Sequence, residues 1–336
     1  MNNVDRIISS GSVDDVLDEQ AEAGLDAELR AWVAGASQHG HRLDRTLAEL
    51  VPEFSRSYLQ QLIGLGAVTL NGGVITKPAT RVKVADTGTV ELRPTPQSQA
   101  FKAESMALNV VYQDEHVLVI NKPANLVVHP APGNWSGTLL NGLLAFDVAF
   151  MDLPRAGIVH RLDKDTSGLM VVARSRLAMD ALVRSIAARD VQRHYLALAH
   201  RQWVGAGRQE VQAAIGRDPR NRLRMSVVDL SQHAGKAART DVELLQNAKD
   251  TCLVKCALHT GRTHQIRVHM AWLGHPLLAD ETYGGADAAG MNRQALHAVQ
   301  LAFNHPVTGQ ALSFRADLPK DFRAAMDELG LRYNLM

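Results

Sequence analysis

The stretch "GIVHRLDKDTSGLMVVA" (residues 157–173) decides the fold, because one polar turn in it joins two apolar runs. The apolar residues on either side predict two short core strands, the first ending at Asp163 and the second resuming after Gly168. The charged residues between them predict a loop that both strands hold in place. Asp163 then either caps the turn or is positioned for chemistry. Spacing alone leaves both interpretations open.

The same four letters, HRLD, open an earlier stretch, "HRLDRTLAELV" (residues 41–51). Here the apolar residues recur at helical spacing, which predicts a helix that starts beside Asp44. A carboxylate in the first turn of a helix lies near the positive end of the helix dipole. We therefore expect Asp44 to be structural, and its replacement by asparagine to cost at most ~1 kcal/mol of stability.

The residues after this helix predict a small, basic RNA-docking unit. Ser55 caps a second helix, and "AVTLNGGVIT" predicts a hairpin closed by an Asn-Gly turn. The stretch at 81–92, "RVKVADTGTVEL", predicts two further short strands around an Asp-Thr-Gly turn. Basic side chains are scattered over the unit and suit contacts with an RNA backbone: Arg42, Arg45, Arg56, Lys77, Arg81 and Lys83.

Composition shifts divide the chain into four parts. Residues 1–38 form an acidic, flexible leader, and residues 39–95 the small basic unit. The proline-rich and polar residues 96–106 form a linker. Strands and helices alternate over residues 107–336, which predicts an α+β domain with a mixed, largely antiparallel sheet.

Composition also limits the classes of protein to which the chain can belong. The 336 residues are 46% hydrophobic and 21% charged, as is ordinary for a globular protein, and no apolar run is long enough to span a bilayer. The first residues, "MNNVDRIISS", are not typical of a secretory signal, and two cysteines cannot form a disulfide framework. We therefore expect a cytoplasmic protein. Residues 1–30 hold eight carboxylates and two arginines, so the remaining chain is basic and suits a polyanion.

Several motifs together resemble known families. The stretch from "RLDRTLAELV" to "AVTLNG" resembles the alpha-L RNA-binding domain, the type found in ribosomal protein S-four. "HRLDKDTSGLMVVA" resembles the signature of RluA-type pseudouridine synthases, and further segments agree in order: "VLVINKPANLVVHP", "RHYLALAH", "TGRTHQIRVHMAWLGHPLLAD" and "RQALHA". The resemblance covers residues 40–325. It implies an isomerase that converts specific uridines of large-subunit (23S) ribosomal RNA to pseudouridine, with Asp163 as the catalytic aspartate.

The chemistry implied by this resemblance needs an ionised carboxylate beside a flat base. Uracil is detached at nitrogen, rotated and rejoined through carbon five, either by attack of the aspartate as a nucleophile or through removal of a sugar proton. The sequence does not choose between these routes. A buried, unpaired carboxylate would take up a proton, so Asp163 needs a fixed cation.

The stretch "TGRTHQIRVH" offers two arginines as that cation. If it is a strand, Arg267 shares a face with Gln265 and His269, and Ile266 points the other way. The resemblance implies that Arg267 pairs with Asp163 and that Ile266 forms an apolar wall near the base. The opposite assignment, with Arg262 as the partner and Arg267 on a phosphate, stays open on period alone.

Two other residues have both a bland and a specific interpretation. Tyr195 alternates with apolar residues on a predicted strand and could simply be core. The resemblance makes it the residue that stacks on the target base. Arg161 could contact a phosphate, or its planar guanidinium could fill the gap that a flipped base leaves.

We expect no metal and no small-molecule cofactor. His259, His264 and His269 recur every five residues, which suits neither a helix face nor a strand face, and carboxylates to complete a site are lacking. We expect a monomer that binds the large-subunit ribosomal RNA or its precursor particle, and no membrane. Two rivals remain: a non-catalytic RNA-binding assembly factor, and a magnesium-dependent phosphatase, whose Asp-x-Asp-x-Thr loop "DKDTSG" matches only out of register.

Overall fold

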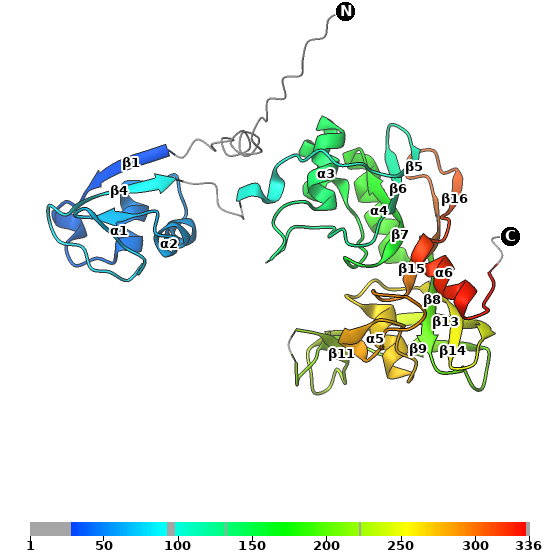
Figure 1. Ribbon diagram of the computed structural model, residues 1–336. Helices are drawn as coiled ribbons and strands as arrows, with labels where there is room; N and C mark the ends of the chain where they lie inside the picture. Colours follow the sequence, from blue (N-terminus) through cyan, green and yellow to red (C-terminus); the bar gives the residue numbers. More distant parts are fainter. Residues whose placement is uncertain (1–27, 93–97, 132, 222, 334–336) are drawn as a thin grey trace, which may run out of the picture. The chain divides into compact units, whose positions relative to one another are not determined.

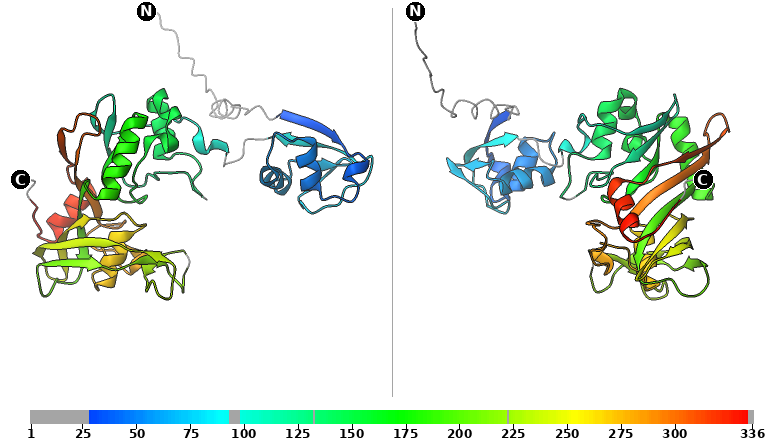
Figure 2. Two further views of the ribbon diagram at one scale, coloured as in Figure 1. Left: turned by 180° about the vertical axis from the view of Figure 1, so that it is seen from behind. Right: turned by 45° about the vertical axis from the view of Figure 1, so that its right-hand side comes forward.

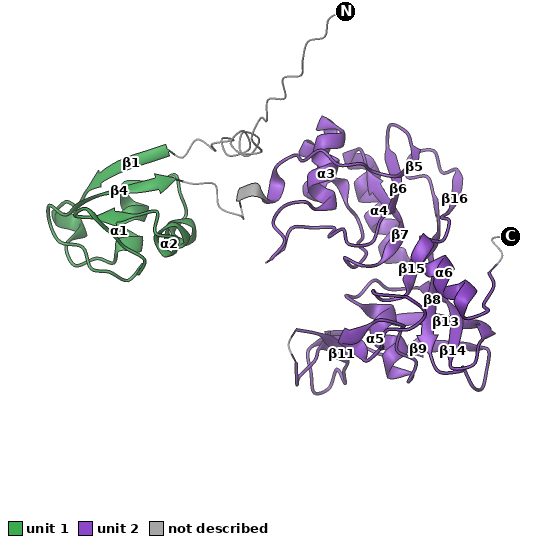
Figure 3. Ribbon diagram, in the orientation of Figure 1, with its two compact units in different colours: residues 1–99 green, residues 100–336 purple. Residues whose placement is uncertain are grey.

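The computed structural model describes residues 28–92, 98–131, 133–221 and 223–333. The chain forms two compact units, which divide between Gln99 and Ala100 (Figure 3). Each unit has its own core, and each is described separately below. No described helix is long and apolar enough to cross a membrane.

The first unit packs two helices against short strands (Figure 1). Ser55 accepts a hydrogen bond from the backbone of Tyr58 and so caps the second helix, as the sequence predicts. The predicted Asn71-Gly72 hairpin turn is present, with positive φ at both residues. The elements are β1 (Glu28–Val33), α1 (Leu43–Leu50), α2 (Arg56–Gly64), β2 (Thr69–Leu70), β3 (Gly73–Val74) and β4 (Thr87–Leu92).

Two expectations for this unit are wrong. The predicted leader ends too late, because β1 pairs antiparallel with β4 and Trp32 is buried in the core. The rest of that leader, residues 1–27, lies outside the described residues. The stretch at 81–92 forms one strand rather than two. The partner of β4 is therefore β1, from before the first helix, which local alternation could not reveal.

The second unit is built on a nine-stranded sheet (Figure 1). Its path of neighbouring strands is β5 (Val110–Gln113), β6 (Val117–Lys122), β7 (Ser167–Ala173), β15 (Leu296–Asn304), β8 (Gln192–His200), β14 (Thr251–Leu258), β13 (Arg239–Asn247) and β9 (Arg208–Gln212), with β16 (Ala311–Arg315) also paired to β15. Of these contacts only that between β7 and β15 is parallel. The α+β class with a mixed, largely antiparallel sheet is confirmed.

Helices cover both faces of this sheet. On one face, α3 (Leu139–Phe146) and α5 (Gln265–Trp272) contribute to the largest apolar core, and on the other face α4 (Arg176–Ala188) and α6 (Lys320–Glu328) pack. Figure 2 shows α6, in red, against the strands of this second face. A small sheet joins β10 (Ile215–Arg217), β11 (Met225–Val227) and β12 (Gly235–Lys236). Short 3₁₀ turns are η1 (Ala36–Gln38), η2 (Ser98–Phe101), η3 (Val148–Asp152), η4 (Pro154–Gly157) and η5 (Glu281–Tyr283).

The predicted linker at 96–106 extends too far. The second unit begins at Ala100, and the side chain of Asn141 in α3 donates hydrogen bonds to the carbonyls of Ala100 (3.3 Å) and Lys102 (2.8 Å). Glu104 accepts from the backbone of Gly137. The polar composition of this segment reflects these contacts with α3 rather than a free connection.

Candidate active site

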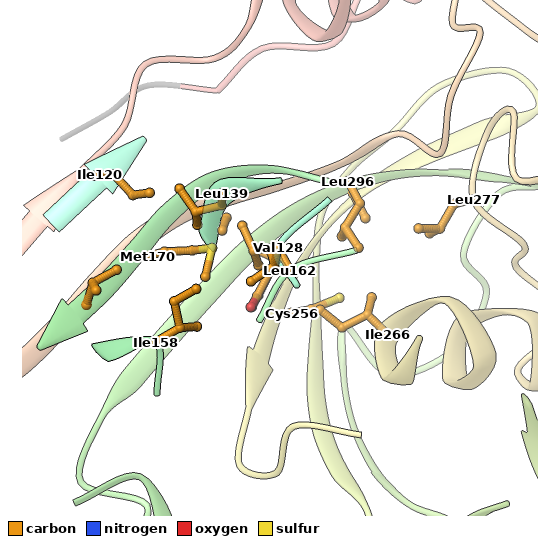
Figure 4. Packing of buried hydrophobic residues seen from close by; sticks show 14 of the residues in the cluster. Ile120, Val128, Leu139, Ile158, Leu162, Met170, Cys256, Ile266, Leu277 and Leu296 are labelled. Atoms are coloured by element: carbon orange, nitrogen blue, oxygen red, sulfur yellow. The ribbon is translucent and has the colours of Figure 1, made fainter. Parts of the chain in front are cut away.

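The loop that carries Asp163, residues 159–166, crosses the face of the sheet that α3 and α5 cover. The expected strand before Asp163 is wrong, since Ile158 makes only a single bridge to Val172 before the chain leaves the sheet. Leu162 is 4% exposed and lies beside Val128 in the apolar core (Figure 4). Because this leucine fixes the middle of the loop in the core, Asp163 is held beside it at the surface of that core.

A buried lysine and a partly buried arginine hold the loop from behind. The Lys122 amine, at the end of β6, donates to the carbonyl of Lys164 at 2.9 Å, and the Arg293 guanidinium donates to the carbonyl of Asp165, also at 2.9 Å. The turn itself closes with a hydrogen bond from the Thr166 amide to the Asp163 carbonyl. The carbonyls of Lys164 and Asp165 are thus fixed by two side chains that are distant in sequence, one at the end of β6 and one just before β15.

Lys122 is an unusual interior residue. It is 1% exposed, and its amine also donates to the carbonyls of Pro123 (2.7 Å) and Leu126 (2.9 Å). Burial lowers the pKa of Lys122 to about 7, although the charges of Asp165 and Asp163 oppose the shift. Three carbonyl acceptors match the three N–H groups of a charged amine.

The Asp163 carboxylate lies beside Arg267, with 3.3 Å between Oδ2 and Nη1. The side chains are 16% and 8% exposed, respectively. Arg267 in turn donates two hydrogen bonds of 2.8 Å to Asp280, which is 1% exposed. Burial opposes the charge of Arg267, but its bonds to Asp280 and Asp163 outweigh burial and raise its pKa. The result is a chain of carboxylate, guanidinium and carboxylate that keeps Arg267 charged and fixed.

Arg267 belongs to a helix, so the strand interpretation of residues 260–269 is wrong. After β14 the chain turns through Gly261, and α5 begins at Gln265. The Gln265 amide accepts from the backbone of Arg262 (3.0 Å) and donates to Thr240 of β13 (2.9 Å), which pins the start of the helix to the sheet. The alternation of polar and apolar residues suggested a strand. In the structure both kinds are buried, so this segment of the helix shows no amphipathic pattern from which a helix could be predicted.

Tyr283 and His264 complete the surroundings of Arg267. The guanidinium lies 5.0 Å from the centre of the Tyr283 ring. The Tyr283 hydroxyl accepts from the Met225 amide at 3.1 Å and lies 2.8 Å from His264 Nδ1. The other ring nitrogen of His264, Nε2, lies 4.0 Å from Asp163 Oδ1. Burial lowers the pKa of His264, which agrees with a neutral ring.

Tyr195 lies in the middle of β8, on the same face as the Asp163 loop, and is 4% exposed. Burial raises its pKa to about 12, with Arg193 opposing and Asp163 adding to the shift. Its phenol therefore stays protonated at neutral pH. Tyr195 lines the cavity described next, so it belongs to both the core and the site.

A cavity of about 600 Å³ opens at Asp163, and a small hollow of about 40 Å³ adjoins it. Arg161, Asp163, Tyr195 and Arg262 line both. Arg161 is exposed, and Arg262 uses its Nε to donate to the Ala237 carbonyl rather than to Asp163. The predicted apolar wall, Ile266, is buried at the small hollow. The structure therefore brings all the predicted residues of the second unit to one place.

The predicted residues of the first unit are arranged differently. Asp44 is fully buried and accepts hydrogen bonds from Arg42 (3.0 Å), Arg56 (3.0 Å) and Gln60 (2.5 Å). Burial opposes the charge of Asp44, but these three donors lower its pKa well below the usual range. Arg42 and Arg56 are thus held by a carboxylate, although each side chain remains nearly half exposed. Lys83 is exposed, and no described residue forms an ion pair with its amine.

The sequence interpretation missed several residues of the site: Asp280, Tyr283, His264, Lys122 and Arg293. Asp280 follows the apolar run "HPLLAD", and an acidic residue closing such a run is a signal that a buried cation lies nearby. Lys122 gives a corresponding signal, because a charged residue ends the apolar strand "VLVINK". Among the described residues, no group of three or more His, Cys, Asp or Glu could hold a metal ion.

Comparisons with known proteins identify two family matches and several relatives of the chain. A model of the RNA pseudouridylate synthase family matches residues 116–272, and one of the S4 domain matches residues 41–87. The chain is 47% identical over 307 residues to a ribosomal large subunit pseudouridine synthase D of Neisseria meningitidis serogroup B, covering 88% of this chain and 80% of that relative. It is 44% identical over 326 residues to the protein of the same name from Xanthomonas campestris, covering 93% and 96%.

Solved structures show a similar fold. The human RNA pseudouridylate synthase domain containing 1 aligns with a TM-score of 0.50 at 29% identity, over 63% of this chain and 84% of that one. The human RNA pseudouridylate synthase domain containing 4 aligns with a TM-score of 0.53 at 23% identity, over 67% and 94%.

Proposed function

The chain belongs to the RNA pseudouridylate synthase family, and from this premise we propose that it isomerises specific uridines of large-subunit (23S) ribosomal RNA, with Asp163 as its catalytic residue. It is an RNA pseudouridine synthase, an isomerase, as the resemblance in the sequence implies. The position of Asp163 carries the proposal: its carboxylate borders a basic cavity and lies 3.3 Å from a buried arginine.

The reaction breaks the bond between C1′ of the ribose and N1 of uracil and forms a bond between C1′ and C5. The hydrogen on C5 leaves as a proton and N1 takes one up, so atoms and charge balance without an oxidant, a reductant or an energy source. Asp163 acts in its ionised form, as a nucleophile or as a base toward a sugar proton. Arg267 balances the charge of Asp163 across an ion pair of 3.3 Å, and Asp280 keeps Arg267 in place.

Tyr195 and Ile266 receive the base. The buried Tyr195 ring offers a flat surface for stacking, and its phenol, with a pKa near 12, is a donor rather than a base at neutral pH. Arg161, exposed beside Asp163, fills the gap that the flipped uridine leaves in the RNA stack. In the first unit, Arg42, Arg56 and Lys83 contact RNA phosphates. The two cysteines are buried and unpaired, which suits a cytoplasmic enzyme.

The rival functions make different predictions. A magnesium-dependent phosphatase needs carboxylates free to hold the metal, whereas the Asp163 carboxylate forms an ion pair with the Arg267 guanidinium. A non-catalytic assembly factor would bind ribosomal RNA and leave it unmodified.

The direct test uses the purified chain and unmodified large-subunit ribosomal RNA, free and in precursor particles. Pseudouridines are mapped by carbodiimide labelling and primer extension. We expect new pseudouridines at a few sites, and none with Asp163→Asn. An RNA that is bound but unchanged would support the assembly factor and contradict the proposal.

A further inference from the structure

The cavity beside Asp163 carries more positive charge than the aspartate can balance. Five arginines line it: Arg155, Arg161, Arg189, Arg193 and Arg262. Asp163 is the only carboxylate among the lining residues, and Arg267 already pairs with it. No ion pair between any of the five and a carboxylate occurs in the described parts of the chain. A concave surface of one charge sign attracts and holds an anion.

Arg193 is the least expected of these five residues. It is 6% exposed and lies on β8 two positions before Tyr195, on the same face of the strand. Its Nε is buried without a hydrogen-bond partner, and no side chain of the described residues pairs with its guanidinium. A Cβ at position 261 would lie 3.3 Å from Arg193 Nη1, so the absence of a side chain at Gly261 leaves space beside the guanidinium. A buried cation without a partner costs stability, unless a ligand supplies the missing charge.

Two other arginines of the cavity lie in strained backbone. Arg155 and the next residue, Ala156, have φ of 55° and 51°, and Arg189, at the end of α4, has φ of 69°. Side chains other than glycine rarely adopt this left-handed conformation, and strain of this kind collects at functional sites. The turn is fixed, since a Cβ on the following Gly157 would lie 1.9 Å from the Ala173 carbonyl of β7. The fold therefore holds Arg155 and Arg189 at the cavity at a conformational cost.

The arginines already affect a neighbour in the cavity. Burial, reinforced by the charges of Arg155 and Arg161, lowers the pKa of His129 to about 4. His129 is therefore neutral at physiological pH and adds no charge of its own. The excess charge in the cavity belongs to guanidinium groups, whose planar forks match the oxygens of a phosphate.

We propose that Arg193, together with Arg155 and Arg189, forms a binding site for RNA backbone phosphates next to the uridine that reacts at Asp163. This inference rests on the proposed function, because it names the part of the same RNA that the cavity holds. The neighbouring Tyr195 and Asp163 face the target nucleotide, so the phosphates within reach are those that flank it. The negative phosphate supplies the charged partner that no described residue gives to Arg193.

The test combines a neutral phosphate with a neutral side chain. A stem-loop RNA is made with one uncharged methylphosphonate linkage at a time on either side of the target uridine. Dissociation constants are measured for the wild type, for Arg193→Met and for Arg208→Met. Arg208 is a matched control, because it lies on β9, pairs with Glu243 and is 80% exposed.

At one or two linkages we expect the neutral phosphate to weaken wild-type binding by about 10-fold or more. Arg193→Met should bind the RNA with all its charged phosphates less tightly than the wild type does, by a similar factor. Its affinity should not fall further when one of those linkages is made neutral. Arg208→Met should respond as the wild type does. We also expect the melting temperature of free Arg193→Met to equal or exceed that of the wild type, because this arginine has no partner to lose.

Two results would overturn the site: wild-type affinity in Arg193→Met, or an equal loss at every linkage in both proteins. Pseudouridine formation by the wild type on the same RNA separates this inference from the proposed function. The phosphate site alone is contradicted if the RNA is modified but no neutral linkage weakens wild-type binding more than it weakens binding by Arg193→Met. If such a linkage exists but the RNA is not modified, the site is supported and the proposed function is contradicted.

Discussion

The two HRLD stretches place aspartates with identical preceding residues in opposite surroundings. Asp44 is fully buried, and three side chains donate to it. Asp163 is 16% exposed, accepts one long hydrogen bond at Oδ2 and borders a cavity of about 600 Å³. Its Oδ1 receives no hydrogen bond from the described residues. The Asp44 carboxylate is occupied by hydrogen bonds that stabilise the fold, whereas Asp163 has one carboxylate oxygen available to a substrate.

The leucine acts alike in both stretches, so the difference comes from elsewhere in the chain. Leu43 and Leu162 are both buried and anchor the aspartate that follows. Around Asp44, α2 supplies Arg56 and Gln60, which close over the carboxylate. Around Asp163, α5 supplies one arginine from one side only. The short motif therefore supplies the buried leucine that holds the aspartate in place. The elements that pack over the motif determine whether the carboxylate is covered by hydrogen-bond donors or open to a substrate.

The strongest challenge to this comparison is Arg267→Met, which removes the cation beside Asp163. Breaking a buried pair typically costs about 3–5 kcal/mol while the partner stays charged, which is ~10²–10⁴-fold in rate. Without the guanidinium, the Asp163 carboxylate loses the cation that lies 3.3 Å away and balances its charge, so we expect the rate to fall by this factor. Single-turnover pseudouridine formation measures this. Arg262→Met is the control and should keep the wild-type rate; a loss in that variant with none in Arg267→Met would reverse the assignment of the two arginines.

Asp44→Asn tests the closed carboxylate. The sequence predicts a loss of at most ~1 kcal/mol, but the buried cluster raises the expected loss to about 3 kcal/mol. The pKa of Asp44 is lowered on folding, so its contribution is full above the ordinary value of 3.8 and is lost as pH falls below it. Hydrogen exchange of α1 and α2 should show the wild-type advantage at pH 7 and a smaller one near pH 3. Equal protection at pH 7 would mean that the cluster adds nothing.

Asp280→Asn tests whether Asp280 holds Arg267 in position beside Asp163. Arg267 would keep Asp163 but lose its charged anchor, so we expect the single-turnover rate to fall about 10-fold with little change in RNA affinity. The neighbouring, exposed Glu281 provides the control Glu281→Gln, which should behave as the wild type. Equal rates in both variants would show that Arg267 holds its position without Asp280.

The smallest expected effect concerns the basic residues of the first unit. No carboxylate of the described residues forms an ion pair with the Lys83 amine, so Lys83→Met should reduce the slope of log affinity against log salt by ~0.7–0.9, as loss of one phosphate contact does. Arg42→Met should also loosen α1 and α2, because Arg42 is tied to Asp44. An unchanged slope for Lys83→Met would place the RNA on another face of this unit.

Much of the fold follows from local pattern, and the remainder depends on contacts distant in sequence. The Ser55 cap, the Asn71-Gly72 turn and the strand of Tyr195 are set by neighbouring residues, and the structure agrees with them. The pairing of β1 with β4 and the helix at Arg267 depend on tertiary burial, which gives no local period.

The site divides in the same way. The motifs identify Asp163, Arg267 and Tyr195 as candidates, and the structure places them together. Asp280 and Arg193 act through their surroundings. Asp280 holds Arg267 by hydrogen bonds, whereas no carboxylate of the described residues pairs with Arg193. Neither property is visible without the packing around it.

The central claim is that Asp163 performs the chemistry and Asp44 does not. The most direct measurement is single-turnover pseudouridine formation by Asp163→Asn and Asp44→Asn on the same ribosomal RNA at saturating protein, at a temperature where both variants are folded. We expect the rate of pseudouridine formation to fall at least about 10⁴-fold in Asp163→Asn while RNA is still bound, and to stay at the wild-type value in Asp44→Asn. An active Asp163→Asn variant, or an Asp44→Asn variant that binds RNA and is inactive, would contradict it.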